Sequence, residues 1–224
     1  KFLRNLYRKF AVANLIANTL SFSCQIINSI IVGQFLGAEA LSVISVCSPL
    51  TFVFLTITGT VIIGGVLLST FYTGECKLKE SGEVFTSCLI LASVICLAVA
   101  AVLLIFREPI IHALCPDETL LSGVRKYYTI FVIGGTGYAV SFIGTPGFLQ
   151  KDGKPVESTL AYIVGTTVST VLCYVLVSTG TMGVEGAALA TVMGSFTSGV
   201  IGAVIILRKG STIRFTRVKV SLIL

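Results

Sequence analysis

The stretch NLIANTLSFSCQIINSIIVG, residues 14–33, is apolar enough to cross a bilayer, yet it carries a regular set of polar side chains. The polar positions follow one another at intervals of four, three, four and three residues: Asn14, Asn18, Ser21, Gln25 and Asn28. This spacing places all five on one face of an α-helix. The sequence therefore predicts a membrane helix with an uncharged polar stripe.

The composition of the whole chain is that of an integral membrane protein. Of its 224 residues, 54% are hydrophobic and 12% are charged, and the mean hydropathy is +0.98. That charged share is about half the usual one for soluble domains. We therefore predict an all-α, multi-pass protein of the cell membrane, in direct contact with the lipid bilayer.

Six segments reach the length of about 20 mainly apolar residues that a membrane helix needs. They cover residues 10–32, 41–72, 84–106, 122–149, 157–179 and 185–207. The predicted fold is a six-transmembrane-helix bundle over residues 1–207, followed by a basic cytoplasmic linker over residues 208–224. The second segment is longer than the bilayer core of about 30 Å requires, so we expect it to bend, with hinges at Pro49, Gly64 and Gly65.

The basic residues are distributed unequally between the two sides of this bundle. All but three of the 16 Lys and Arg lie before the first segment, in the second-to-third and fourth-to-fifth loops, or after the sixth segment. The exceptions are Arg107, Arg125 and Lys126. The positive-inside rule then predicts that both termini are cytoplasmic. This bias also accounts for a pI near 9.0 without a nucleic-acid partner.

Chemistry-bearing residues are scarce inside the predicted spans. All ten Asp and Glu lie in loops or at helix ends, there is one His, and the seven Cys lack metal-ligand spacing. We therefore expect no catalytic residues, no metal site and no bound cofactor, and the chain is not predicted to be an enzyme.

The fifth span carries a second polar face, formed by Thr166, Ser169, Thr170 and Cys173 at helical spacing. Two interpretations apply to this face and to the first stripe. The side chains either form hydrogen bonds between helices, as in many membrane bundles, or line a water-filled cavity. Because the first stripe is long, we interpret both as candidate cavity walls.

Two further patterns give local expectations. The glycines of GGTGYAVSFIGTPGF, residues 134–148, favour close packing of the fourth span against its neighbours over a binding break in that helix. Tyr127 and Tyr128, at the outer end of the same span, are typical of an aromatic belt at the membrane interface.

Four stretches resemble the multidrug and toxic compound extrusion (MATE) family: INSIIVGQFLGAEAL (27–41), GGVLLSTFYTGE (64–75), QKDGKPVEST (150–159) and MGVEGAALAT (182–191). The resemblance implies one lobe of a twelve-helix transporter, whose second six-helix lobe would follow in the same chain. It also implies export of small organic compounds in exchange for H⁺ or Na⁺, with the coupling ion undetermined. Asn28, Ser169 and Cys173 stand where relatives carry Asp, Asn and Asp, so we expect the coupling acid in the other lobe.

Two alternatives remain beside an antiporter. A lipid-linked saccharide flippase of the same superfamily is disfavoured because no Lys or Arg lies at mid-membrane depth to bind pyrophosphate. A six-span scaffold without transport activity would bury the first stripe against another helix and leave no cavity.

Overall fold

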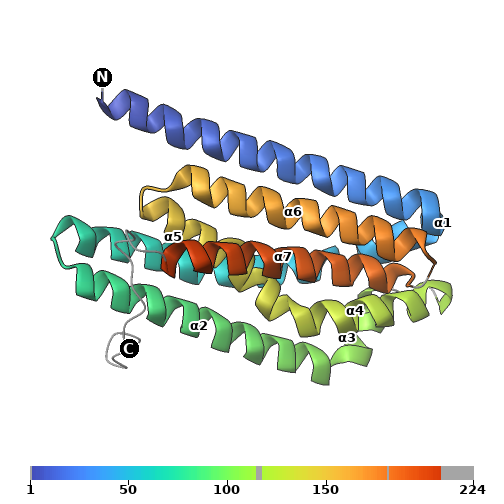
Figure 1. The fold of residues 1–224 in the computed structure, drawn as a ribbon. Coiled ribbons are helices and arrows are strands. Elements are labelled where there is room, and N and C mark those ends of the chain that lie inside the picture. The colour runs from blue at the N-terminus through green and yellow to red at the C-terminus, as the bar shows by residue number, and fades with distance from the viewer. Residues whose placement is uncertain (1, 115–117, 181, 208–224) are drawn as a thin grey trace.

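The structure is a computed structural model that describes residues 2–114, 118–180 and 182–207, and these residues form a bundle of helices (Figure 1). The helices are α1 (Phe2–Gly74), α2 (Leu78–Ile105), α3 (Arg107–Leu114), α4 (Glu118–Ala139), the π-helix η1 (Val140–Gly144), α5 (Thr145–Lys151), α6 (Pro155–Ser178) and α7 (Val184–Leu207). No strand occurs within these ranges. The predicted all-α class is confirmed.

The helix α1 reverses direction at Gly37, the one residue inside it whose backbone angles are not helical (φ 83°, ψ −175°). We call residues 2–36 the first arm of α1 and residues 38–74 the second arm. Figure 1 shows the second arm running back along the bundle after the turn. The first two predicted spans lie in these two arms, and the first helix extends beyond the predicted residue 32 to the turn.

Four helices are long and apolar enough to cross a membrane: residues 10–74 of α1, then α2, α6 and α7. The part of α1 that qualifies has 65 residues. At about 1.5 Å per residue it is some three times the thickness of a bilayer core, so its two arms provide two crossings. The helix α4 is less apolar than these four, since it contains Arg125 and Lys126. The helices η1 and α5 continue it as far as Lys151.

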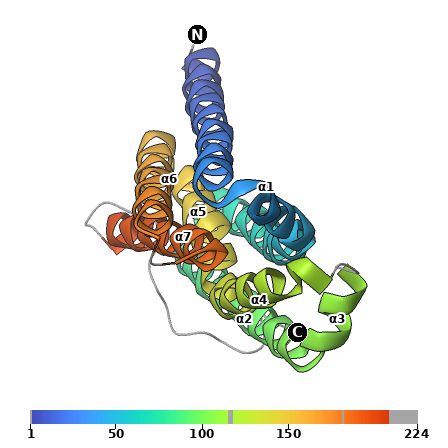
Figure 2. The same ribbon diagram turned by 90° about the vertical axis from the view of Figure 1, so that its right-hand side faces the viewer.

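The buried apolar side chains form three clusters, one of them around Phe85 and Phe148 where the second arm, α2 and α5 meet. The second arm packs with α2 and α4 around Phe54, Tyr128 and Phe131, which are at most 1% exposed. The first arm packs with α6 and α7, and Figure 2 shows it standing at the side of the bundle. Between α6 and α7 the backbones touch, because a Cβ on Gly165 would lie 2.7 Å from the carbonyl oxygen of Gly194.

The glycines of α4 also permit close contacts, as the sequence predicted. A Cβ added to Gly134 would lie 2.6 Å from Val192, and one on Gly135 would lie 2.7 Å from Phe54. The π-helix η1 follows these glycines directly. The segment therefore combines tight packing with an irregular turn of the kind that often marks functional sites in helices.

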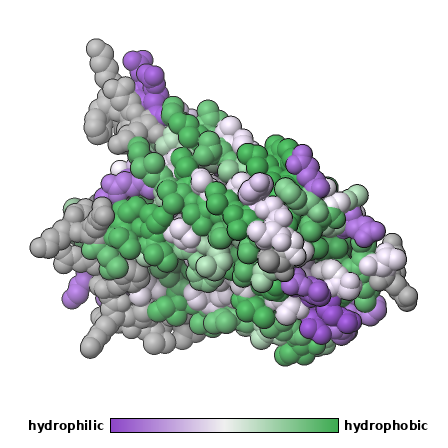
Figure 3. Space-filling model, turned by 45° about the vertical axis from the view of Figure 1, so that its right-hand side comes forward, coloured by the Kyte–Doolittle hydropathy of each residue, from purple (hydrophilic) through white to green (hydrophobic). Residues whose placement is uncertain are grey.

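The surface has a broad apolar band with hydrophilic residues gathered toward the two ends of the molecule (Figure 3). Exposed apolar side chains come from several helices and include Ile26 of the first arm, Leu67 of the second arm, Leu97 of α2 and Val200 of α7. This distribution is that of a bundle that spans a bilayer along its long axis.

Candidate functional site

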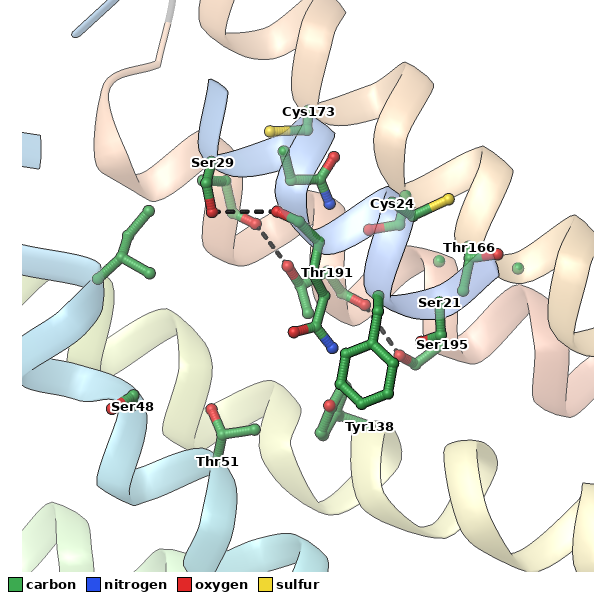
Figure 4. Close-up of a pocket in the computed structure, with 18 of the residues that line it drawn as sticks. Ser21, Cys24, Ser29, Ser48, Thr51, Tyr138, Thr166, Cys173, Thr191 and Ser195 are labelled. Carbon is green, nitrogen blue, oxygen red and sulfur yellow. Dashed lines mark hydrogen bonds between the residues drawn. The ribbon is translucent and has the colours of Figure 1, made fainter. Parts of the chain in front are cut away.

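A cavity with a volume of about 480 Å³ lies between the first arm of α1, the start of its second arm, α4, α6 and α7. Figure 4 shows Ser48 and Thr51 of the second arm on the opposite side of this cavity from Cys173 and Thr166 of α6. The volume is in the range of small-molecule sites in proteins. The cavity is therefore the candidate functional site.

Seven of the nine predicted site residues line this cavity. They are Asn18, Ser21, Gln25, Asn28, Thr166, Ser169 and Cys173. The first four come from the first arm and the other three from α6, and these two helices run side by side (Figure 1). The two polar faces that the sequence predicted separately thus meet at one site.

The other two predicted residues lie elsewhere. The Asn14 side-chain oxygen accepts a hydrogen bond of 3.0 Å from the Gln150 amide of α5, outside the cavity. The Thr170 hydroxyl donates to the backbone oxygen of Thr166 at 3.1 Å. Neither residue lines the cavity: Asn14 links two helices, and Thr170 bonds within its own helix.

The cavity also has a polar wall that the sequence analysis did not identify. It comprises Ser48, Thr51, Tyr127, Tyr138, Tyr162, Thr191, Ser195 and Ser198. The spacing of Thr191, Ser195 and Ser198 on α7 places them on one helix face, and this pattern was visible in the sequence. The three tyrosines show no comparable spacing in the sequence. They line the cavity because of how their helices pack together.

Tyr127 and Tyr128 do not form the predicted aromatic belt. Tyr127 is 7% exposed and its ring stacks on Phe131, with centroids 5.9 Å apart. Tyr128 is fully buried and its hydroxyl donates to the Leu103 backbone oxygen at 2.7 Å. Both rings pack inside the bundle because α4 lies between the second arm, α2 and α7.

Several hydroxyls of the cavity wall form hydrogen bonds of two kinds. Those of Ser29, Thr166, Thr191 and Ser195 donate to backbone oxygens of their own helices, at distances from 2.9 to 3.1 Å. The hydroxyls of Ser21 and Tyr162 pair with each other at 3.1 Å. The hydroxyls of the first group already donate their protons to backbone oxygens, but their oxygen atoms can still accept hydrogen bonds.

Two polar atoms of described residues that line the cavity are buried without any hydrogen-bond partner. They are Asn28 Oδ1 and the Ser198 hydroxyl oxygen. Buried polar groups without partners are uncommon in native structures and need an explanation such as a water or a ligand. Both residues border the cavity, while the two unpartnered atoms themselves are buried in its wall.

Among the residues that the structure describes, the cavity lining contains no Asp, Glu, Lys, Arg or His, so this part of the wall carries no charge. Across the ranges that the structure describes, no cluster of three or more His, Cys, Asp or Glu could hold a metal ion. Away from the cavity, Glu108 pairs with Arg125 at 2.6 Å and Glu185 pairs with Lys126 at 3.0 Å. The neighbouring guanidinium groups of Arg107 and Arg125 lower the pKa of Glu108.

The backbone is helical at all three predicted hinge positions. Gly65 has a packing role, since a Cβ there would lie 2.9 Å from the Cβ of Cys88 on α2 and still closer to its sulfur. Gly64 faces open space. Hinge motion at Pro49, Gly64 or Gly65 stays a prediction, and the sharp turn of this region is at Gly37.

The comparisons with known proteins agree with this geometry. The MatE family profile matches residues 14–175, which include most of the cavity wall. The chain belongs to the MATE family. The multidrug export protein MepA of Staphylococcus haemolyticus is 23% identical over 206 residues, covering 92% of this chain and 45% of MepA.

Solved MATE structures share the fold of this chain. An outward-facing MATE transporter superposes with a TM-score of 0.86 at 16% identity, over 97% of this chain and 49% of its own. The Vibrio cholerae transporter VcmN in its bent form gives 0.86 at 18% identity, over 98% and 50%. The MATE-family chain described here spans about half the length of these relatives, as expected for one lobe of such a transporter.

Proposed function

We propose that this MATE-family chain is one six-helix lobe of a cation-coupled antiporter that exports small organic compounds. The observation that carries the proposal is the cavity of about 480 Å³, formed by the stripe of the first arm and the polar face of α6. A scaffold would fill that space with side chains. The likeness to a multidrug export protein supports the same assignment.

The proposal includes a second lobe and an orientation of this chain in the membrane. Transporters of this architecture bind substrate between bundles and expose the site alternately by moving one bundle against the other. A partner bundle would cover the exposed side of the first arm, where Phe22, Ile26 and Ile30 are between half and two-thirds exposed. The distribution of Lys and Arg supports cytoplasmic termini for this segment in the cell membrane.

The coupling ion of the proposed antiporter is H⁺ or Na⁺. The cavity of this lobe contains no carboxylate or imidazole that could carry a transported proton. We therefore place the coupling acid in the second lobe. The amide of Asn28 could coordinate Na⁺ or bond a substrate, but it cannot titrate.

The test is transport by the intact transporter reconstituted in liposomes. A fluorescent organic compound is loaded, and its flux is followed after a H⁺ gradient or a Na⁺ gradient is imposed separately. We expect one gradient to drive flux against the compound's own gradient, and the Asn28→Leu variant to reduce that flux. Absence of flux with either gradient, over a panel of organic compounds, would refute the antiporter assignment.

A further inference from the structure

We propose that the N-terminal end of the first arm binds the phosphate head group of an acidic phospholipid through Arg4, Tyr7 and Arg8, which we call the head-group site. This site lies outside the cavity, and the inference goes beyond the proposed transport. It requires only that the bundle spans a bilayer. Three observations carry it: the three residues share one side of the helix, the two arginines lack acidic partners, and the site lies just beyond the apolar part of the arm.

The three residues of the head-group site lie together on the surface of the first arm. Tyr7 and Arg8 follow Arg4 by three and four residues, a spacing that places all three on one side of a helix. All three side chains are exposed, Tyr7 to 74%. Figures 1 and 2 show this end of the arm apart from the other helices. Two guanidinium groups one turn apart repel each other, so an anion bound by both would relieve this repulsion.

The two arginines of the head-group site have no acidic partner. Neither Arg4 nor Arg8 forms an ion pair with a residue that the structure describes. The first arm itself offers none, because the first acidic residue of the chain is Glu39. At the opposite end of the bundle, Lys and Arg side chains pair with carboxylates at 2.6 to 3.0 Å: Arg107 and Arg125 with Glu108, and Lys126 with Glu185. The counter-charge of Arg4 and Arg8 therefore comes from outside the described helices.

The position of the site along the arm corresponds to the lipid head groups. The apolar stretch that is able to cross a membrane begins at Phe10. At about 1.5 Å per residue, Arg8 and Arg4 lie roughly 3 and 9 Å beyond it along the helix axis. The head-group layer on each side of a bilayer core is about 5–8 Å thick. Both guanidinium groups are thus within reach of the lipid phosphates, and Tyr7 lies where tyrosines are enriched in membrane proteins.

The chemistry of the three side chains fits a phosphate. A guanidinium group can donate two parallel hydrogen bonds to two oxygens of one phosphate, and it is more weakly hydrated than an ammonium group. The Tyr7 hydroxyl supplies a further donor. A zwitterionic head group also contains a phosphate, but its own ammonium group compensates the charge. The site should therefore prefer a lipid with a net negative charge, such as phosphatidylglycerol.

Native mass spectrometry of the intact transporter tests the inference, because it counts the lipids bound to each protein molecule. The protein in detergent is mixed with dioleoyl phosphatidylglycerol, dioleoyl phosphatidylcholine or inorganic phosphate. These probes are an acidic lipid, a zwitterionic lipid with the same chains, and an anion without chains. We expect the first phosphatidylglycerol to bind at least about fivefold more tightly than phosphatidylcholine. Inorganic phosphate at equal concentration should not displace it.

Variants assign the tightest-bound acidic lipid to the head-group site. Arg4→Gln and Arg8→Gln should each weaken its binding roughly fivefold, and the double variant about thirtyfold, without changing the binding of phosphatidylcholine. Both positions are exposed and glutamine is a good helix former, so these variants should fold like the parent. Lys79→Gln removes the same charge from an exposed position of α2 at the same end of the bundle. It is the control and should leave the affinity unchanged.

The results that would overturn the inference are distinct from those that concern transport. The inference fails if Lys79→Gln weakens binding as much as the arginine variants do, or if the double variant keeps the parent affinity. It also fails if phosphatidylglycerol binds no better than phosphatidylcholine, or if inorganic phosphate displaces it. Loss of thermal stability in the double variant without added lipid would overturn it too, and would indicate acidic residues of the second lobe as the partners. Flux measurements decide the antiporter separately, whichever lipid binds.

Discussion

The hydroxyl oxygens of Ser21 and Tyr162 lie 3.1 Å apart and join the first arm of α1 to α6 beside the cavity. The Thr159 hydroxyl, which also lies 2.9 Å from a backbone oxygen of its own helix, contacts the Ala13 backbone oxygen at 3.3 Å. Farther along the arm, the Ser23 and Ser29 hydroxyls donate to backbone oxygens of the arm itself. The arm is thus anchored by hydrogen bonds in its first half and held by packing in its second half, where Gln25 and Asn28 lie.

Removing the Tyr162 hydroxyl should weaken this anchor. We expect Tyr162→Phe to lower the free energy of unfolding by about 0.6 kcal/mol and by no more than roughly 1.7 kcal/mol, the range for hydrogen bonds between membrane helices. Thermal unfolding in detergent measures the change. Tyr174→Phe, on the same helix and 52% exposed, is the control, and equal losses in both variants would contradict a specific role of the Ser21–Tyr162 pair.

Replacing Gly64 or Gly65 of the second arm by alanine should change the stability of the protein by different amounts. Gly65→Ala places a methyl group against Cys88 and should destabilise the protein by roughly 1–3 kcal/mol through overpacking. Gly64→Ala faces open space and should be neutral or slightly stabilising. Unfolding midpoints of both variants test this, and adding Cys88→Ala to Gly65→Ala should recover most of the loss. If the two single variants behave alike, close packing does not explain Gly65.

The turn between the arms should require glycine at position 37 because of the backbone conformation there, and not because a side chain would lack space. Gly37 adopts φ 83° and ψ −175°, and no atom lies within 4 Å of the position of a Cβ. Gly37→Ala should therefore cost about 1–3 kcal/mol in backbone strain without any clash. Gly183→Ala, at a glycine with open space and no positive φ, is the matched control. An unchanged unfolding midpoint in Gly37→Ala would show that the turn tolerates a side chain.

The half-buried ammonium of Lys151 should give the protein a pH-dependent stability. Lys151 donates to the Ser81 hydroxyl at 2.6 Å, and burial lowers its pKa below the ordinary value of 10.5. The unfolded chain then binds this proton more tightly than the folded one, so the free energy of unfolding rises as the pH rises from the lowered pKa toward 10.5. Lys151→Met and Lys151→Arg should both lack that rise, since neither can lose a proton in this range.

Unfolding midpoints measured between about pH 7 and 10.5 provide the comparison. Groups other than Lys151 contribute equally to all three proteins, so the difference between the parent curve and each variant curve isolates this lysine. Parallel curves would mean that the lysine titrates alike in the folded and unfolded chains.

A carboxyl group in the cavity should make transport sensitive to pH. The described cavity wall of this lobe holds no Asp, Glu or His, so Asn28→Asp adds a titratable group to it. We expect flux by the intact transporter to depend on pH between about 5 and 8 more steeply in this variant than in the parent. Asn14→Asp, outside the cavity and beside Gln150, is the control and should leave the profile unchanged. Identical profiles for all three proteins would place Asn28 away from the transport route.

The sequence by itself determined the class of the protein and the polar faces of individual helices. Hydropathy identifies apolar segments because a bilayer accepts only long, uncharged stretches, and helical periodicity groups Asn18, Ser21, Gln25 and Asn28 because their spacing is a property of one helix. The absence of charge at the middle of the spans could also be read directly from the sequence. These inferences needed no information about which helices are neighbours.

Only the tertiary structure decided what each polar face meets. Asn14 belongs to the same stripe as Asn18, but Gln150 of α5 lies opposite it, so it bonds to a helix instead of lining the cavity. Tyr127 and Tyr138 reach the cavity because α4 packs beside the second arm and α7, and Ser198 does so because the α6 and α7 backbones touch at Gly165 and Gly194. The periodicity of a helix fixes the direction of a side chain, but the group facing it depends on helices distant in sequence, whose positions are set by packing.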